Sequence, residues 1–575
     1  MNMTFLRRHA WALIFTVFVG FSAVLPALIA PFYIGSEYKG IQFTPLDDED
    51  TYRARIHEIL DGHFSVASPF MYEYKSSPVP MPPVNEWLYA IPSFLFGLST
   101  IIIVSKFVLP GLLFFLAYLL IRNIIGRDER STVVTSITGG LFAVLSVDLV
   151  DYGYLFSLLQ GNPPRPLLWT RLVNPIIGAV EIFAFLNLVW VTVAQRWKYA
   201  YIGAGVVLAL SVGYYFSFGI SAALLGVLFC VYVYRREFGI ARELAATGAL
   251  ALLLSTPYWY TVVGVVGGSR ELAMRNGMFF THMPVFNKAL ITATLIVLVA
   301  YTYAYIRGTA RAFAREWIFV GALIGAGWIV FNEQVFTGRE IWHHHFVQYT
   351  VPLSAIAIVL AMHLTIRERL PRLFQAGILA LFILCAGYGL YSIASFASRT
   401  DDFAQSQVYA PVGEWLNANA PKDCVVLVKE DSDQFERFIA AYTGCNVYSS
   451  DVAYSGVPME RIEHNFFLHM RFSDVKLGDA ETYLWANEGF VRGTFYEDWN
   501  QALMSADPEF SARKIAYLVP AYQEFAGGNL EEQIRKYRVD YVVSEEPIPE
   551  GLMGQLPNLV QESEVGQYHV YRFRP

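Results

Sequence analysis

The sequence predicts a polytopic α-helical membrane domain followed by a soluble α/β domain. Of the 575 residues, 55% are hydrophobic and only 16% are charged, whereas a soluble protein has about a quarter of its residues charged. Apolar runs of about 20 residues, the length that spans a bilayer, recur until about residue 395. After about residue 400, helix-like and strand-like segments alternate instead. We therefore predict a membrane domain over residues 1–395 and an α/β domain over 400–575.

About eleven membrane spans are predicted from the apolar runs. The first run is too long for the core of a cleavable signal peptide and reads as a retained signal anchor. The fifth and sixth runs merge in the sequence. The predicted spans are 10–31, 100–122, 132–149, 173–194, 199–215, 217–234, 243–265, 288–306, 316–332, 346–364 and 374–395.

Lys and Arg in the short loops predict the orientation, because such loops are enriched on the cytoplasmic side. With a cytoplasmic N-terminus, every inside segment is basic, for example "QRWK" and "YRREFGIAR". The outside segments are then 32–99, 150–172, 266–287, 333–345 and the whole C-terminal domain. We predict a multi-pass protein of the plasma (inner) membrane, in the cell envelope, with an extracytoplasmic C-terminal domain.

The C-terminal domain shows repeated helix–strand steps. "VYAPVGEWLNANAPKDCVVLVKED" predicts a helix, a Pro turn and a buried strand, and "LEEQIRKYRVDYVVSEEP" repeats the step, which favours parallel strands. No Gly-rich phosphate loop is present, so no nucleotide site is predicted. Cys424 and Cys445 flank the first unit, either as a disulfide in an oxidising compartment or as two small core residues. The net charge of −7, without a long basic run, argues against nucleic-acid binding.

The first outside loop carries the most concentrated negative charge of the chain. Asp47, Asp48, Glu49 and Asp50 are consecutive and are followed by "DTYRARIHEILDGHF", which has helical spacing. Asp47 and Asp50 share a face of such a helix, because residues three apart are neighbours. Asp48 and Glu49 are interpreted as plain solvated charge. Later in the loop, "PPVNEWLYAIPSFLFGL" predicts a short interfacial helix.

Two further outside loops carry charged or titratable residues. Asp148 and Asp151 are again three apart, and Arg165 and Arg171 follow them. The next span contains a single acidic residue, Glu181, and an ionisable residue within a span is a functional candidate; pairing with a neighbouring helix is the alternative.

The loop before the tenth span contains Glu333, Arg339 and three consecutive histidines, His343–His345. Three adjacent histidines of a helix cannot all face one metal ion. Contact of one or two of them, His345 in particular, with a phosphate or sugar is one interpretation. A structural role is the other.

Taken together, carboxylates, arginines and histidines gather in loops at one face of the membrane. Carboxylates serve as a general base or hold a divalent cation such as Mg²⁺ or Mn²⁺, and arginines bind phosphate. A site with both at the edge of a bilayer suits a lipid phosphate. A lipid-linked sugar fits this pattern, with its tail in the membrane.

The sequence resembles the GT-C membrane glycosyltransferases over most of its length. In "DDEDTYRARI", the residues Asp47, Tyr52 and Arg53 are spaced like the "D…YR" segment of oligosaccharyltransferase catalytic subunits. Asp148 and Asp151 lie where that group has a second acidic pair, although here the pattern is D-x-x-D. "PPVNEWLYAIPSFLFGLS" resembles the end of the first loop of protein mannosyltransferases and aminoarabinose transferases. The "WWDYG" motif is missing from the soluble domain, so asparagine-linked protein glycosylation is not predicted.

This resemblance implies an inverting transfer of a sugar from a polyprenyl-phosphate or -diphosphate carrier to an acceptor outside the cytoplasm. The acceptor class, whether glycan, lipid or protein, is open. Asp47 is the first candidate for the base, with Asp48 or Asp50 as alternatives. Arg171, Arg339 and His345 are the phosphate-binding candidates. Asp47, Asp148 and Asp151 are the candidate metal ligands, and Glu181 is a further acidic candidate.

Two other functions fit part of the pattern. A polytopic transporter or flippase also has many spans and buried charges, but more typically shows inverted repeats and broken helices at the midplane. A polysaccharide polymerase or ligase uses the same lipid-linked donors with a different loop performing the chemistry. Sugar transfer by the purified protein, set against uptake into vesicles, separates transfer from transport.

Overall fold

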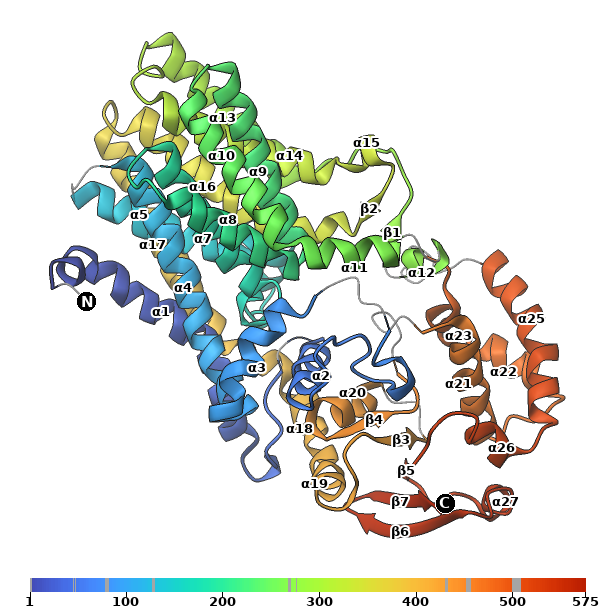
Figure 1. Cartoon of the computed structure of the whole chain (residues 1–575). Coiled ribbons are helices and arrows are strands. Elements are labelled where there is room, and N and C mark those ends of the chain that lie inside the picture. The colour runs from blue at the N-terminus through green and yellow to red at the C-terminus, as the bar shows by residue number, and fades with distance from the viewer. Residues whose placement is uncertain are drawn as a thin grey trace.

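The computed structural model describes residues 3–44, 46, 48–77, 82–126, 130–266, 270–275, 277–429, 433–450, 457–498 and 508–574. A bundle of long helices is followed in the chain by a mixed helix–sheet region (Figure 1). This architecture confirms the predicted fold class. The division near residues 395–400 remains our proposal for the domain boundary.

Nine helices within the described ranges are long and apolar enough to cross a membrane. They coincide with nine of the eleven predicted spans. The helices are α1 (Met3–Ile34), α4 (Leu98–Ile125), α5 (Arg130–Leu149), α7 (Ile176–Val193), α9 (Tyr215–Tyr234), α13 (Lys288–Ile306), α14 (Ala314–Phe331), α16 (Val347–Ile366) and α17 (Pro371–Tyr391).

The two remaining predicted spans form shorter helices. The predicted span 199–215 becomes α8 (Ala200–Leu210) and the 3₁₀ turn η4 (Ser211–Gly213), which leads into α9. The predicted span 243–265 is divided between α10 (Phe238–Leu254) and α11 (Thr256–Val266). Pro257 follows this break directly, and a proline cannot donate the amide hydrogen bond that would continue α10.

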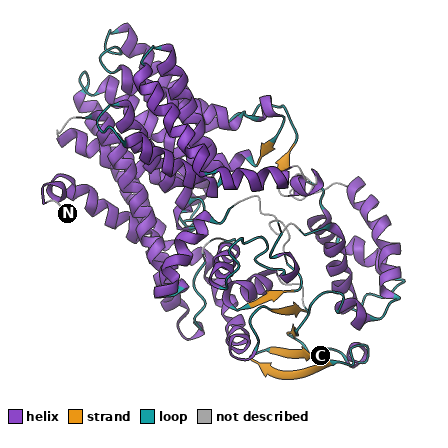
Figure 2. Cartoon of the chain, viewed as in Figure 1, coloured by secondary structure: helices purple, strands orange, loops and turns teal. Residues whose placement is uncertain are grey.

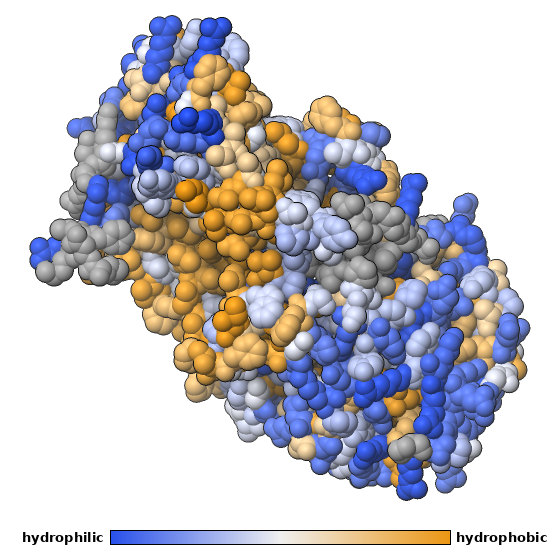
Figure 3. Space-filling view, viewed as in Figure 1, coloured by the Kyte–Doolittle hydropathy of each residue, from blue (hydrophilic) through white to orange (hydrophobic). Residues whose placement is uncertain are grey.

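The surface separates the two parts of the chain by polarity. An apolar band crosses the helical bundle, and the C-terminal region beyond it is largely hydrophilic (Figure 3). Large apolar side chains on the outside of the bundle, such as Leu253 (71% exposed) and Val299 (71%), belong to the kind of surface that contacts lipid. The distribution is that of a multi-pass membrane protein.

The loops between the spans contain ordered elements. The predicted helices of the first loop are present as α2 (Glu49–Leu60) and α3 (Val84–Phe96). Leu95 of α3 is 80% exposed, as is typical of a helix that lies at a membrane interface. The other loop elements are α6 (Tyr152–Leu159), α12 (Arg270–Arg275), α15 (Gln334–Thr337), the antiparallel pair β1 (Met278–Phe279) and β2 (Glu340–Ile341), and the 3₁₀ helices η2 (Tyr72–Tyr74), η3 (Leu168–Thr170) and η5 (His343–Phe346).

The C-terminal region contains a five-stranded sheet of order β4-β3-β5-β7-β6 (Figure 2). As predicted, β3 (Cys424–Val428) pairs in parallel with both β4 (Cys445–Val447) and β5 (Tyr541–Ser544). The antiparallel hairpin β6 (Leu559–Val565) and β7 (Tyr568–Phe573) was not predicted. The helices are α18 (Thr400–Ser406), α19 (Ala410–Asn419), α20 (Asp433–Tyr442), α21 (Met459–Phe472), α22 (Ala480–Ala486), α23 (Glu488–Phe495), α25 (Pro508–Ala526), α26 (Leu530–Ile534) and α27 (Glu550–Met553).

Cys424 and Cys445 form a disulfide bond. The two residues are direct partners in the register of β3 and β4. Of the two alternatives left open by the sequence, the structure therefore has the disulfide.

The first loop packs into the core of the α/β region. Ala54, Phe70 and Met71 are buried in one apolar cluster with residues of β3 and α20. The amide of Val447 in β4 donates to the carbonyl of Phe70 at 2.9 Å, so the loop covers the edge of the sheet. A second contact joins α12 to this region, because Arg275 Nη1 donates to the Tyr496 carbonyl at 2.5 Å.

Candidate functional site

The acidic segment of the first loop meets two cations of the membrane domain at the start of α2. Asp48 forms an ion pair with Arg171, which follows η3 in the second loop. Glu49 accepts a hydrogen bond from Lys106 Nζ of α4 at 2.5 Å. Asp47, the first candidate for the base, lies outside the described residues. Its role stays a prediction.

The interpretation of Glu49 as solvated charge is wrong, whereas Asp48 is 32% exposed and paired with Arg171. Glu49 is 1% exposed, and burial raises the pKa of its carboxyl to about 7 although Lys106 opposes this shift. Lys106 is itself buried and also donates to the Thr170 carbonyl at 2.7 Å. Glu49 is therefore buried between a span and the second loop, and Asp48 and Glu49 each have their own cation.

Asp50 lies on the side of α2 that faces the C-terminal region. It lines a cavity of about 50 Å³ together with Arg399, Gln434 and Tyr442. Burial raises the pKa of its carboxyl, against the charges of Arg53, Arg437 and Lys106. Asp50 thus contributes to the junction with α20 rather than to the Arg171 pair.

Arg171 has donor capacity left after it pairs with Asp48. The bond to Asp48 uses Nη2, whereas Nε is buried and has no hydrogen-bond partner among the described residues. The guanidinium lies over the ring of Tyr52, 5.5 Å from its centroid. It also interacts electrostatically with His345 and Tyr349, so residues of the first loop, the second loop and α16 meet here.

The three histidines point to different partners. His345 Nδ1 shares a hydrogen bond of 3.3 Å with the Tyr214 hydroxyl, and its ring stacks between Phe216 and Trp342 at centroid distances of 5.0 and 5.2 Å. His343 pairs with Glu340. His344 is exposed. One histidine, His345, therefore lies within electrostatic reach of Arg171, and its contact with a phosphate or sugar stays a prediction.

Glu181 is buried within α7 and is 8% exposed. Its carboxylate interacts with Ser217 of α9 and lies near Tyr349. Its Oε2 has no hydrogen-bond partner among the described residues. Glu181 therefore lies on the membrane side of the same group of residues, and its role stays a prediction.

The acidic pair of the second loop is neutralised within that loop. Arg165 Nε binds Asp148 at 3.1 Å and Arg165 Nη2 binds Asp151 at 2.6 Å. The guanidinium also lies over the ring of Tyr154 at 3.9 Å. Asp148 is buried and Asp151 is 43% exposed.

Arg339 is exposed at the end of α15, and its backbone amide donates to Thr337 Oγ1 at 3.2 Å. Within the described ranges, no contact joins its side chain to Arg171 or His345. Glu333, at the start of the same segment, accepts a hydrogen bond from the Tyr215 hydroxyl. Phosphate binding by Arg339 stays a prediction that this geometry does not support.

Of the candidate metal ligands, only Asp148 and Asp151 lie within the described residues. The described residues contain no group of three or more His, Cys, Asp or Glu side chains that could hold a metal ion. The carboxylates of Asp148 and Asp151 share the Arg165 guanidinium, so a cation at this pair would compete with an existing positive charge. The reaction proposed below is therefore written without a metal.

Two functional candidates were missed in the sequence. Lys106 is the single charge in the apolar run "STIIIVSKFVLPGLLFF", and the rule that ionisable residues within spans are functional candidates would have identified it. Tyr214 stands among other aromatic residues in "GYYFSFG". No sequence signal distinguishes it from them.

An apolar groove of about 550 Å³ lies next to this group of residues. Its walls come from the first loop at residues 82–84, from α8 and η4, and from the α10–α11 break. Val84 and Val212 line the groove. The residues that follow them in the chain, Asn85 and Gly213, pack closely together, because a Cβ added to Gly213 would lie 2.7 Å from Asn85 Oδ1. The residue after Gly213 is Tyr214, which bonds His345.

Comparison with known proteins gives a fold likeness. No family model and no curated protein matches the sequence. An oligosaccharyltransferase from Archaeoglobus fulgidus, crystallised with zinc and sulfate, is similar over 93% of this chain and 67% of its own, with 13% identity and a TM-score of 0.46.

ArnT from Cupriavidus metallidurans is similar over 95% of this chain and 96% of its own, with 12% identity. The TM-score is 0.44 for its apo structure and 0.43 for its complex with undecaprenyl phosphate. Both proteins are GT-C glycosyltransferases, the superfamily that the sequence resembles. At these identities and TM-scores the likeness is one of overall fold alone.

Proposed function

We propose that the protein is a membrane glycosyltransferase that transfers a sugar from a polyprenyl-phosphate or -diphosphate carrier to an acceptor on the extracytoplasmic face. The observation that carries this proposal is the Arg171 guanidinium. It is mostly buried, it is already paired with a first-loop carboxylate, and its Nε has no partner among the described residues. Buried donors are almost always satisfied, and a phosphate oxygen would satisfy this one.

The surroundings suit a donor with an apolar tail and an anionic head. The apolar groove would take the first part of the polyprenyl chain. Arg171 would bind the phosphate, because a guanidinium donates several hydrogen bonds in one plane. His345 is held beside it by Tyr214, Phe216 and Trp342. The chain thus offers an apolar groove and, in the loops beside it, a mostly buried cation with one donor to which no described residue is bound.

In the proposed reaction, a first-loop carboxylate removes the proton from an acceptor hydroxyl. The acceptor oxygen attacks the anomeric carbon from the face opposite the phosphate, and the bond from that carbon to the phosphate oxygen breaks. The electron pair leaves with the polyprenyl phosphate, whose charge Arg171 stabilises. Asp47 is the first candidate for the base. Asp48 is the alternative, because its carboxylate lies at the Arg171 guanidinium.

Transfer from a panel of radiolabelled polyprenyl-phosphate sugars tests this function. We expect transfer by the purified wild type and a loss of at least about 10²-fold in Asp47→Asn, since general bases contribute 10²–10⁴-fold. Glu37→Gln is the matched control, because Glu37 is an exposed carboxylate of the same loop. A chelator arm tests the metal prediction.

Each outcome of this test has a defined meaning. Retained transfer in Asp47→Asn together with a loss in Asp48→Asn would move the base to Asp48. Absence of transfer by the wild type from every donor would contradict the proposed function. Substrate uptake into vesicles would then favour a transporter instead.

A further inference from the structure

Helix α2 begins with Glu49 and Asp50 of the acidic segment and contacts the α/β region along the rest of its length. Arg53, in its second turn, donates from Nε to the Ala441 carbonyl at 3.2 Å. The same guanidinium lies 3.8 Å from the ring centroid of Tyr442. Both partners belong to α20. The position of α2 therefore depends on the α/β region as well as on the membrane domain.

A second contact holds the C-terminal end of α2. Lys75 Nζ donates to both oxygens of Glu58, at 2.8 Å each, and to Asp423 at 3.0 Å. His63 Nε2 bonds the same Asp423 oxygen at 3.0 Å. Lys75 and Glu58 are 7% and 9% exposed. We name these four residues, Glu58, His63, Lys75 and Asp423, the latch.

The Lys75–Glu58 pair of the latch is buried. Loss of one partner of a buried ion pair leaves the other charge without compensation, which is far more costly than loss of an exposed pair. A third residue pair supports the latch from the surface, because Lys422 Nζ donates to the Asp61 carbonyl at 2.6 Å. Lys422 is 55% exposed, so its contribution is expected to be the smaller one.

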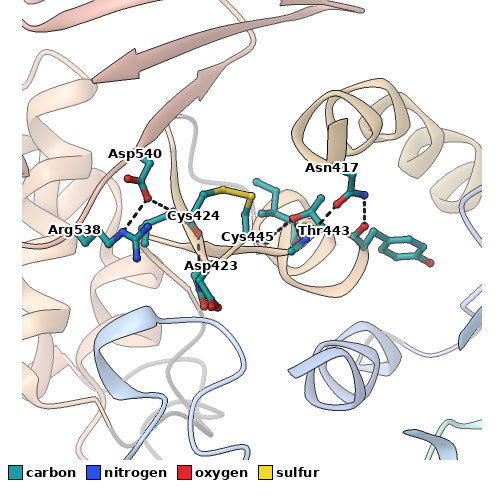
Figure 4. The surroundings of a disulfide bond; sticks show 12 residues. Asn417, Asp423, Cys424, Thr443, Cys445, Arg538 and Asp540 are labelled. Atoms are coloured by element: carbon teal, nitrogen blue, oxygen red, sulfur yellow. Dashed lines mark hydrogen bonds and ion pairs between the residues drawn. A yellow bond between two sulfur atoms is a disulfide. The ribbon is translucent and has the colours of Figure 1, made fainter. Parts of the chain in front are cut away.

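Asp423 is held in place from within the α/β region. Its backbone has a φ of +60°, and its amide donates to the Gly444 carbonyl at 2.7 Å. The next residues along each strand, Cys424 and Cys445, form the disulfide. Figure 4 shows the Asp423 side chain pointing away from the strand beside this bond. The disulfide thus ties the Asp423 segment to the start of β4, which follows α20.

We propose that Lys75 and Asp423 are positioning residues: the latch, fixed by the Cys424–Cys445 disulfide, sets the position of α2 and hence of the acidic segment against Arg171 and Lys106. This inference rests on the proposed function for its effect on sugar transfer. The α/β region then acts on the reaction by holding the first loop. A displacement of about 1 Å in a reacting group costs on the order of 10²-fold in rate.

Hydrogen exchange of the α2 amides tests the latch independently of sugar transfer. We expect exchange at least tenfold faster in Lys75→Met, in Asp423→Ala and in the double variant Cys424→Ser/Cys445→Ser. The conservative Lys75→Arg, which keeps the charge, should restore protection. Glu562→Ala is the matched control, because it removes a surface ion pair with Arg572, 3.5 Å long, in the β6–β7 hairpin. Unchanged α2 exchange in Lys75→Met and Asp423→Ala would overturn the proposal.

The transfer assay then separates positioning from a merely structural role. We expect kcat to fall at least tenfold in Asp423→Ala while KM for the lipid-linked donor stays within about twofold, with kcat restored in Lys75→Arg. If Asp423→Ala shows faster α2 exchange but its kcat equals that of the Glu562→Ala control, the positioning role is overturned. Absence of transfer by the wild type would contradict the proposed function alone, since the exchange measurement decides whether the latch holds α2.

Discussion

The first and second loops each carry a group of acidic residues, yet different parts of the chain neutralise the two groups. Asp48 and Glu49, in the first group, bind Arg171 and Lys106, which lie 123 and 57 positions further along the chain. Asp148 and Asp151 share one guanidinium, that of Arg165, which is at most 17 positions away. The first segment depends on tertiary assembly, whereas the second is satisfied locally.

The two acidic groups differ in how many polar atoms remain available to a ligand. Arg165 donates to one oxygen of Asp148 and one of Asp151, so the positive charge of one guanidinium already neutralises this pair of carboxylates. In the first segment, by contrast, Arg171 Nε and Glu49 Oε1 are buried without partners among the described residues. Unsatisfied buried polar atoms are a marker of sites that bind ligand or water. The acidic segment of the first loop, together with Arg171, is therefore the better candidate for the reaction, and the group of Asp148, Asp151 and Arg165 for a structural role.

The largest expected effect is on stability, from removal of one cation that pairs with each acidic group. Lys106→Met should lower the free energy of unfolding by about 3 kcal/mol at pH 8, because Glu49 is left buried without its partner. Arg165→Met should cost less than about 1 kcal/mol, since Arg165 is 46% exposed. Chemical unfolding in detergent micelles measures both. Equal losses would contradict the contrast between the two loops.

The next effect concerns the transfer rate. Arg171→Lys keeps the charge but removes the planar set of donors, and we expect kcat to fall about 10²-fold, as for other groups that stabilise developing charge. Arg165→Lys should change kcat by less than about threefold, because Arg165 neutralises carboxylates of its own loop. Steady-state transfer with a fixed donor measures both rates. A larger loss in Arg165→Lys would move the candidate site to the Asp148–Asp151 pair.

The sequence predicted elements whose signal is local. Apolar runs identified the long spans, and alternating segments identified the parallel strands β3, β4 and β5. The β6–β7 hairpin was missed, because "LVQESEVGQYHVYRF" has no Asn-Gly or Asp-Gly turn and its first strand is mostly polar. The predicted span 243–265 overlooked the stop that Pro257 imposes on α10.

The site depended on contacts that no local pattern contains. Helical spacing predicts that neighbouring residues of the acidic run point in different directions, but it does not say which direction meets Arg171. Glu49 was assigned to solvent because it stands among charged residues, whereas its environment is set by Lys106 of α4. Burial of Phe70 and Met71 in the core of the α/β region likewise follows from the tertiary fold.

The smallest expected effect is a difference in pH dependence between the two loops. Burial raises the pKa of Glu49 to about 7, above the value of about 4.3 of an unfolded Glu. Between these values the folded protein binds more protons than the unfolded one, so the contribution of Glu49 to stability falls as pH rises. The variant Glu49→Gln should therefore gain about 2 kcal/mol relative to wild type between pH 5 and pH 8.

The contribution of Asp151 to stability depends on pH in the opposite direction to that of Glu49. Slight burial raises the pKa of its carboxyl, but hydrogen bonds and the charge of Arg165 outweigh this and hold the pKa below its usual value. Its contribution is therefore present above about pH 4 and is lost as pH falls through the lowered pKa. Because Asp151 is 43% exposed, Asp151→Asn should change stability by only a few tenths of a kcal/mol. Unfolding midpoints of both variants from pH 3 to pH 8 measure the two slopes, and slopes of the same sign would show that the two carboxylates share one kind of environment.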